Sequence, residues 1–398
     1  MSDAPRRRPG PCRRKPHARR EFRWTGTTAF RRARRIVVKI GTSSLTLPDG
    51  SLDVSRIEDL SRQAARLARR GYEQVLVSSG AIGVGARRLG IERRPRTMPE
   101  KQAAAAVGQG LLMQAYERAF FDQGLVVAQV LLTGEDIADR RRHLNSRNTM
   151  LKLLELGAVP VVNENDTVAV DEIRLGDNDT LSALVATLID ADLLVILSDV
   201  DGLYSVDPRK APDARLVDVV GEITPELWKA AGGAGSPFGT GGMATKLEAA
   251  RIVTAAGIPM FLTRGSRPAV LERVVAGDAV GTLFLPRPRP LTARQRWLAF
   301  HQRPRGLVQV DPGAVRALLE QGKSLLPAGV VSVDGRFQEG DLVRVCDAQG
   351  REVARGLVNY SSDDLRRIQG VHTSDIARVL GRKDYDEVIH RDNLVVSV

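Results

Sequence analysis

Cysteine and long apolar runs are both scarce in this sequence, and aromatic residues make up only 4% of it. The two cysteines, Cys12 and Cys346, are too few for a disulfide framework or a four-ligand zinc site, and they suit a reducing compartment. No run approaches the roughly 18 apolar residues of a bilayer span, and the N-terminus lacks the apolar stretch of a secretory signal. We therefore expect a cytoplasmic protein with no membrane partner.

The remaining composition is that of a globular protein. Of the 398 residues, 43% are hydrophobic and 27% are charged, with a mean hydropathy of −0.16. This length corresponds to about two or three domains, each able to bury a core without disulfide bonds or structural metals.

The net charge of +12 is concentrated at the N-terminus. Residues 1–35 hold thirteen Arg and Lys against two acidic residues, which leaves a net charge of only +1 for the rest of the chain. Four prolines and the absence of helical periodicity predict that residues 1–34 are a disordered, Arg-rich extension. The extension is either a polyanion-binding arm or dispensable, and we favour the second because charged runs are usually solvated.

Strands and helices alternate over residues 35–285. Near-continuous apolar strands separated by amphipathic helices predict a three-layer αβα sandwich with a mostly parallel central sheet. In such sheets ligands bind beyond the carboxyl ends of the strands. The predicted strands are 35–41, 75–79, 126–132, 159–163, 193–198 and 259–263.

A second, smaller domain is predicted after a linker. Three prolines within residues 286–290 cannot continue a helix or a central strand, so we place a Pro/Arg-rich linker at 286–304. Residues 305–398 form the second domain, with one predicted helix at 312–321 and predicted strands at 306–310, 330–333, 341–346 and 353–359. This domain is therefore β-rich.

Two strand ends carry residues suited to anions. Lys39 lies inside an apolar strand, where its ammonium group requires an anionic partner unless the side chain reaches solvent. Ser78, Ser79 and nearby glycines lie where the next strand leads into a helix, and backbone N–H groups there form an anion seat or simply a tight turn. The glycine pattern is not the dinucleotide-binding fingerprint, because Arg88 stands where the third glycine is needed.

Two further clusters supply carboxylates, amides and a second lysine. Asn163 to Asp166 ends a strand and Gly176 to Thr180 opens a helix. This cluster suits an amino acid's ammonium group, Mg²⁺ held through water, the orientation of a lysine, or helix capping. Ser198 and Asp199 follow another buried strand, and a glycine-rich loop ends at Lys246 without matching a Walker A motif. Two lysines, glycine-rich turns and carboxylates together predict phosphoryl transfer, which depends mainly on positioning and charge neutralisation. All five histidines lie outside these turns, so nothing favours a Ser/His/Asp triad.

These motifs together resemble a known family. In chain order the sequence contains VVKIGTSSL, SSGAIGVG, NENDTV, GDNDTLSALVA, SDVDGLYSVDPR and GTGGMATK, and it resembles the glutamate 5-kinase family of the amino-acid kinase superfamily. The resemblance implies the amino-acid kinase fold for residues 35–285 and a PUA-like fold for residues 305–398.

The resemblance also implies a reaction and its residues. The family transfers the terminal phosphoryl group of ATP to the 5-carboxylate of L-glutamate, the first step of proline synthesis, with Mg²⁺ on the phosphates and no metal ligand assigned to the protein. Lys39 and Lys246 would neutralise the transferring group, and Asp179 would hold both ammonium groups. Glutamate would be bound by Ser79, Asp166 and Asn178. The ATP-binding set would be Lys39, Ser198, Asp199, Thr240, Gly241, Gly242, Met243, Ala244, Thr245 and Lys246.

Other functions stay open at this stage. A sibling kinase acting on another acid would carry similar motifs, and an RNA-binding or RNA-modifying protein would use the second domain and the basic extension. The second domain has thirteen basic and fourteen acidic residues, which argues against binding nucleic-acid phosphates. The resemblance further implies a homo-oligomer and functional coupling to a glutamyl-phosphate reductase.

Overall fold

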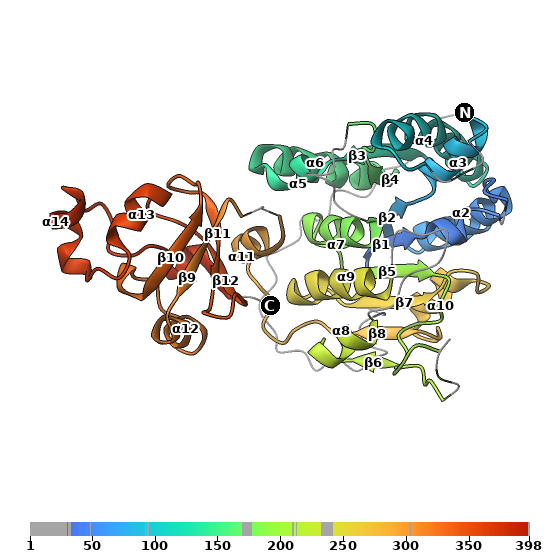
Figure 1. Cartoon of the computed structure of the whole chain (residues 1–398). Coiled ribbons are helices and arrows are strands. Elements are labelled where there is room, and N and C mark those ends of the chain that lie inside the picture. The colour runs from blue at the N-terminus through green and yellow to red at the C-terminus, as the bar shows by residue number, and fades with distance from the viewer. Residues whose placement is uncertain are drawn as a thin grey trace, which may run out of the picture.

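The computed structural model consists of two domains joined by a short helical segment (Figure 1). It describes residues 30, 33–47, 49–91, 93, 95–168, 177–208, 211, 213–231, 242–301 and 304–396. No helix among these residues is long and apolar enough to cross a membrane.

An eight-stranded sheet forms the centre of the first domain. Its strand order is β3-β4-β2-β1-β5-β7-β8-β6, and only the β7–β8 pair is antiparallel. The strands are β1 (Arg35–Ile40), β2 (Glu73–Ser78), β3 (Val127–Leu132), β4 (Val159–Glu164), β5 (Leu193–Ser198), β6 (Val219–Val220), β7 (Met260–Arg264) and β8 (Thr282–Phe284). The predicted mostly parallel sheet is confirmed. The sequence did not reveal β6 and β8, which are too short to show a periodicity.

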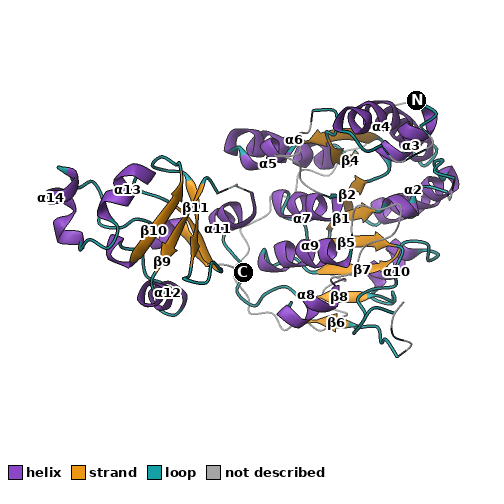
Figure 2. Ribbon diagram, viewed as in Figure 1, coloured by secondary structure: helices purple, strands orange, loops and turns teal. Residues whose placement is uncertain are grey.

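Helices cover both faces of this sheet, as Figure 2 shows. They are α2 (Val54–Arg69), α3 (Ala81–Arg88), α4 (Met98–Phe121), α5 (Gly134–Ala138), α6 (Arg140–Glu155), α7 (Asn178–Leu188), α8 (Pro225–Ala231), α9 (Met243–Ala255) and α10 (Val270–Ala276). The predicted three-layer αβα sandwich is therefore confirmed.

Alternation along β1 sends successive side chains into two different cores. Val37 belongs to the core that contains residues of α7 and α9, whereas Val38 belongs to the core that contains residues of α2 and α4. Side chains two residues apart on a strand share a face. Lys39 therefore lies on the same face as Val37, against α7 and α9.

Helices α3 and α4 approach each other unusually closely. A Cβ atom added at Gly85 would lie 1.8 Å from the backbone oxygen of Ala104, and one added at Gly108 would lie 1.8 Å from that of Ala81. Neither position can hold a side chain without moving a helix. This contact fixes the depth at which α4 lies beside the strand ends.

The first domain begins earlier than the sequence predicted. Phe30 and Ala33 fall within the predicted extension 1–34, but they are only 5% and 2% exposed. Phe30 contacts Phe261 edge-on, with ring centroids 5.4 Å apart. The extension therefore does not run to residue 34, because these two apolar side chains belong to the core that contains residues of α2 and α4. Residues 1–29 lie outside the described part of the chain.

The second domain has its own five-stranded sheet, ordered β10-β9-β11-β12-β13. Its strands are β9 (Gly306–Val310), β10 (Val330–Gly335), β11 (Leu342–Cys346), β12 (Glu352–Leu357) and β13 (Leu394–Val396), and its helices are α12 (Pro312–Leu319), α13 (Ser362–Ile368) and α14 (Ile376–Leu380). All four predicted strands and the predicted helix are present. The separate sheet and core confirm the small β-rich domain.

The segment between the domains contains α11 (Ala293–Arg296) and a π-helical turn at Trp297–His301. Leu298 is fully buried in a small cluster with Leu342 and Val395 of the second domain. Arg251 of α9 stacks over the ring of Phe300, 5.3 Å from its centroid. The predicted linker is thus packed against both domains in this region.

Candidate active site

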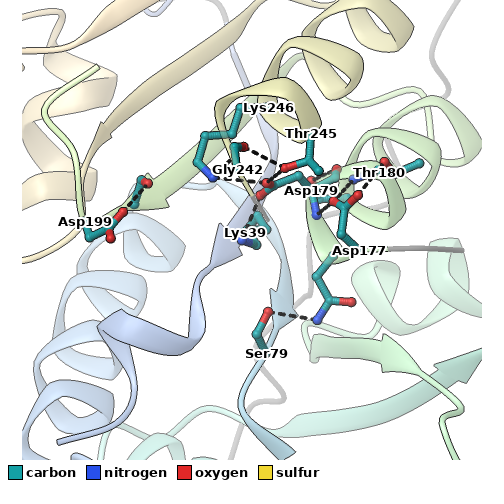
Figure 3. A network of polar contacts seen from close by, with 12 residues as sticks. Lys39, Ser79, Asp177, Asp179, Thr180, Asp199, Gly242, Thr245 and Lys246 are labelled. Carbon is teal, nitrogen blue, oxygen red and sulfur yellow. Dashed lines mark hydrogen bonds and ion pairs between the residues drawn. The ribbon is translucent and has the colours of Figure 1, made fainter. Parts of the chain in front are cut away.

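Two lysines from distant parts of the chain meet on one carboxylate (Figure 3). Lys39 Nζ lies 2.7 Å from Oδ1 of Asp179, and Lys246 Nζ lies 3.1 Å from Oδ2 of the same residue. Lys39 is at the carboxyl end of β1, Asp179 is in the first turn of α7, and Lys246 is in the first turn of α9. The structure therefore brings together the three residues that the sequence predicted as catalytic.

Local capping places the two helix starts. Asp177 caps α7, because its Oδ1 accepts hydrogen bonds from the backbone N–H groups of Asp179 (2.7 Å) and Thr180 (2.9 Å). Thr245 Oγ1 lies within hydrogen-bond distance of both Asp179 Oδ2 (2.7 Å) and the backbone oxygen of Gly242 (2.8 Å). The starts of α7 and α9 are thereby held side by side on the same face of the sheet.

The charged cluster is almost completely buried. Lys39, Lys246 and Asp179 are 7%, 6% and 0% exposed. Burial alone would raise the pKa of Asp179, but the two neighbouring ammonium groups outweigh it and hold that pKa well below its usual range. Asp179 is therefore ionised, and the three groups together carry one net positive charge. A buried surplus of positive charge favours an anionic ligand.

Asp177 adds a second carboxylate whose ionisation is disfavoured. Burial and the charge of Asp179 raise the pKa of Asp177 above its ordinary value, although its hydrogen bonds to Thr180 and the charge of Lys39 act in the opposite direction. The sequence offered Asp177 both as a helix cap and as one of the polar residues suited to an ammonium group, and the structure shows the capping role.

A cluster of amides and hydroxyls lies at the neighbouring strand ends. Asn178, next to Asp179, directs its side-chain nitrogen at three acceptors: the backbone oxygen of Ser78 (2.7 Å), Ser79 Oγ (2.9 Å) and Asn163 Oδ1 (3.0 Å). These residues end strands β2 and β4, which are adjacent in the sheet. Ser79 and Asn178, two of the three predicted glutamate-binding residues, are thus in direct contact.

Two of the predicted ATP-binding residues, Ser198 and Asp199, lie at the end of β5. Ser198 is 5% exposed and donates a hydrogen bond to Asp199 at 3.1 Å. In Figure 3, Asp199 lies to the left of the lysine pair. Two residues further on, Asp201 accepts hydrogen bonds from Arg264 (2.9 and 3.1 Å) and Arg267 (2.7 Å). This fixes the turn after β5 against the end of β7.

The structure describes only some of the remaining predicted site residues. Asp166 is half-buried in the turn after β4. Met243, Ala244 and Thr245 form the first turn of α9, directly before Lys246. Thr240 and Gly241 lie outside the described residues.

The described residues contain no group of three or more His, Cys, Asp or Glu side chains that could hold a metal ion. Mg²⁺ usually keeps several waters and binds through one or two carboxylates together with substrate phosphates. The donor set present here therefore fits an ion that is bound mainly by a nucleotide.

The sequence profile of the amino acid kinase family matches residues 34–264, and that of the PUA domain matches residues 306–380. The first match spans more than half of the chain, so the chain belongs to the amino acid kinase family. Its central sheet and flanking helices accordingly represent the amino-acid kinase fold, followed by a PUA domain.

Curated relatives narrow this class. The glutamate 5-kinase of Moorella thermoacetica is 55% identical over 368 residues, which is 92% of this chain and 97% of that protein. The glutamate 5-kinase of Caldanaerobacter subterraneus subsp. tengcongensis is 53% identical over 362 residues, covering 91% and 97%. That of Cyanothece sp. is 53% identical over 363 residues, covering 91% and 99%. Within the family, the chain therefore groups with the glutamate 5-kinases.

Sequence reasoning missed one part of this site. Asn163 was noted among the polar residues at the end of β4 without a role of its own. Gln109 of α4, whose Oε1 accepts a hydrogen bond from Asn163 Nδ2 at 2.9 Å, was not noted at all. Asn163 had a signal, because it ends an apolar strand. Gln109 had none, since a single glutamine in a long helix gives no indication of what it contacts.

Proposed function

We propose that this chain transfers the terminal phosphoryl group of ATP to the 5-carboxylate of L-glutamate, forming ADP and L-glutamyl 5-phosphate, the first step of proline synthesis. The observation that carries the proposal is the pairing of Lys39 and Lys246 on Asp179, beside the amide cluster of Asn178 and Ser79. The glutamate 5-kinases named above support the choice of glutamate as the acceptor.

The chief obstacle in this reaction is the approach of two anions. A carboxylate with a pKa near 4.3 is already ionised at neutral pH, so its attack needs no general base. Lys39 and Lys246 supply the compensating charge, and at an effective dielectric constant of about 20 each is worth about 4 kcal/mol to a unit negative charge 4 Å away. Asp179 fixes both ammonium groups before the substrates arrive, so little reorganisation is needed.

Glutamate recognition follows from the orientation of Asn178. Its amide nitrogen faces three protein acceptors, so its oxygen lies on the opposite side of the carboxamide. No hydrogen bond to that oxygen comes from the described residues. An amide oxygen accepts hydrogen bonds from an ammonium group, which suits the α-amino group of glutamate. Ser79 and Asp166 complete the proposed glutamate-binding set.

In this proposal ATP lies between the end of β5 and the start of α9. Ser198, Asp199 and the segment from Thr240 to Lys246 contact the nucleotide, with backbone N–H groups at the start of α9 directed at its phosphates. Mg²⁺ bound to those phosphates would supply additional neutralisation of their charge.

The test uses hydroxylamine, which traps an acyl phosphate as a stable hydroxamate. With ATP, Mg²⁺ and L-glutamate we expect hydroxamate formation, and with aspartate or N-acetylglutamate we expect little. Lys246→Met is expected to lower kcat by roughly 10³-fold with a much smaller change in KM. The matched control is Lys152→Met, which removes a lysine that is 60% exposed on α6. Near-normal turnover by Lys246→Met would contradict the assignment.

The same proposal covers the partners. The acyl phosphate is labile, so we expect functional coupling to a glutamyl-phosphate reductase in the cytoplasm, and we expect a homo-oligomer. An RNA-related function is not favoured, because the curated relatives are glutamate 5-kinases and the second domain has no basic surplus.

A further inference from the structure

Gln109 of α4 is a buried glutamine that contacts the amide cluster through Asn163. It is 9% exposed, and its Oε1 accepts a hydrogen bond from Asn163 Nδ2 at 2.9 Å. Its own Nε2 is buried and has no hydrogen-bond partner within the described part of the chain. A buried polar atom left unpaired is costly, so the fold retains this glutamine at a cost in stability.

One backbone group fixes the orientation of Asn163. The N–H of Glu164 donates to Asn163 Oδ1 at 2.9 Å. A backbone N–H cannot exchange its role, so the oxygen of Asn163 must face it and the nitrogen must face the other way. Gln109 Oε1 is the acceptor that receives this nitrogen. Without that acceptor, Asn163 Nδ2 would itself be a buried, unpaired donor.

Asn163 passes this orientation on to Asn178. Asn163 Oδ1 is one of the three acceptors that surround Asn178 Nδ2, at 3.0 Å. As long as Asn163 is held, the nitrogen of Asn178 stays turned toward the protein and its oxygen away from it. If Asn163 rotated to pair its free nitrogen elsewhere, Asn178 would keep Ser78 and Ser79 but lose one of its three acceptors, so its present orientation would be less strongly favoured.

The helix crossing holds Gln109 at the depth that this contact requires. Gln109 directly follows Gly108, whose missing side chain allows α4 to touch α3. Helix α3 begins at Ala81, two residues after Ser79. In this closely packed helix pair, α4 therefore carries Gln109, and α3 begins directly beyond Ser79.

We propose that Gln109 is a positioning residue for the amino-acid substrate: by holding Asn163, it fixes the face that Asn178 presents to the ammonium group. This inference rests on the proposed function, because it concerns the same glutamate site. Within the described part of the chain, no hydrogen bond joins Gln109 to Ser198 or Asp199 at the end of β5. The loss of Gln109 should therefore affect glutamate and ATP differently, which a general weakening of the fold would not do.

The test compares Gln109→Met with Gln74→Met. Gln74 is a matched control, because it is 2% exposed, donates one hydrogen bond to the backbone oxygen of Ala64 and leaves its Oε1 unpaired. It lies near the start of β2, at the opposite end of the strand from Ser78. We expect Gln109→Met to raise the glutamate KM about tenfold, the effect of losing one well-oriented hydrogen bond, with the ATP KM within about twofold of the wild-type value. Gln74→Met should change neither KM.

A double-mutant cycle with Asn178→Ala checks the route of action. If Gln109 acts through Asn178, adding Gln109→Met to Asn178→Ala should raise the glutamate KM no further. Equal effects on both KM values, or additive effects in the cycle, would overturn the inference.

Gln109→Glu guards against a misfolded methionine variant, because it keeps an acceptor oxygen for Asn163. We expect its glutamate KM to stay within about threefold of the wild-type value, and a tenfold rise would count against the proposal. The proposed function fails separately: in that case the wild-type chain would form no glutamyl hydroxamate, or Asn178→Ala would leave the glutamate KM unchanged. An active wild type and a sensitive Asn178→Ala with an unaffected Gln109→Met would overturn only the role of Gln109.

Discussion

Substituting Asp179 by asparagine tests the central charge arrangement most directly. The substitution keeps the size of the side chain but removes the negative charge that both buried lysines contact. Lys39 and Lys246 would then be two ammonium groups, 7% and 6% exposed, with no carboxylate between them.

The expected magnitude follows from the distances. The ion pairs measure 2.7 and 3.1 Å, and at an effective dielectric constant of about 20 they correspond to gross attractions of about 6 and about 5 kcal/mol. Desolvation of the ions offsets much of this, so removing the shared partner should lower the free energy of unfolding by about 3–5 kcal/mol. That loss corresponds to a decrease of roughly 10 °C in the unfolding temperature of the first domain. Since the lysines would also move apart, kcat should fall by roughly 10²- to 10³-fold.

A second substitution, Lys246→Met, sharpens this test, because it should change the free energy of unfolding in opposite directions with and without Asp179. In the wild-type background, Lys246→Met removes an attraction to Asp179 and should lower the free energy of unfolding. In the Asp179→Asn background the same substitution removes an uncompensated charge and its repulsion from Lys39. There it should raise the free energy of unfolding, by about 1–2 kcal/mol.

Urea denaturation of the wild type, the two single variants and the double variant measures stability, and hydroxamate formation measures turnover. Equal destabilisation by Lys246→Met in both backgrounds would show that Asp179 and Lys246 are not coupled. The reasoning from the shared carboxylate would then be refuted, whatever the turnover values are.

Three further predictions concern packing and pH. Gly108→Ala should lower the free energy of unfolding, measured by urea denaturation, by several kcal/mol, because its Cβ would lie 1.8 Å from a backbone oxygen. Gly110→Ala is the control in the same helix: its Cβ would have no neighbouring atom within 4 Å, so the substitution should raise the free energy of unfolding by about 0.5–1 kcal/mol. Hydrogen bonds from Arg264, opposed in part by burial, lower the pKa of Asp201 from 3.8 to about 2. The stability that Asp201 contributes should therefore be present above pH 4 and lost as the pH falls toward 2. We expect Asp201→Asn to flatten acid denaturation curves in that window. Phe30→Ala should cost about 3 kcal/mol in thermal unfolding, because this ring is 5% exposed and packs on Phe261.

The sequence predicted the layers of the fold because periodicity reports burial. Strands that are buried on both faces, such as β4 and β5, appear as continuous apolar runs. The short β6 and β8 give no such signal, and neither does β13 in the second domain. The boundary at Phe30 was missed because a single aromatic residue beside a basic run carries no periodicity, although it buries a large side chain.

The sequence motifs predicted that Lys39, Lys246 and Asp179 meet, and the arrangement of the sheet explains how they do. Lys39 stood out because a lysine inside an apolar strand needs a partner. Nothing in the sequence alone shows that α7 and α9 both pack on its face of the sheet, since that depends on which strands are neighbours. The resemblance to a family implied that Asp179 holds both lysines, and the alternation of Val37 and Val38 between two cores supplies the physical reason.

The two halves of the site therefore differ in how they can fail. Around Asp179 the side chains are fixed by full charges in a buried setting, so a substitution there changes stability and turnover together. Around Asn178 they are fixed by neutral amides whose nitrogen and oxygen are similar in size, so the wrong orientation costs little packing. Only the hydrogen-bond partners distinguish the two orientations: the backbone oxygen of Ser78, which Asn178 contacts directly, and the N–H of Glu164, which acts through Asn163. For this reason we expect changes in the amide chain to affect substrate affinity while leaving the fold largely intact.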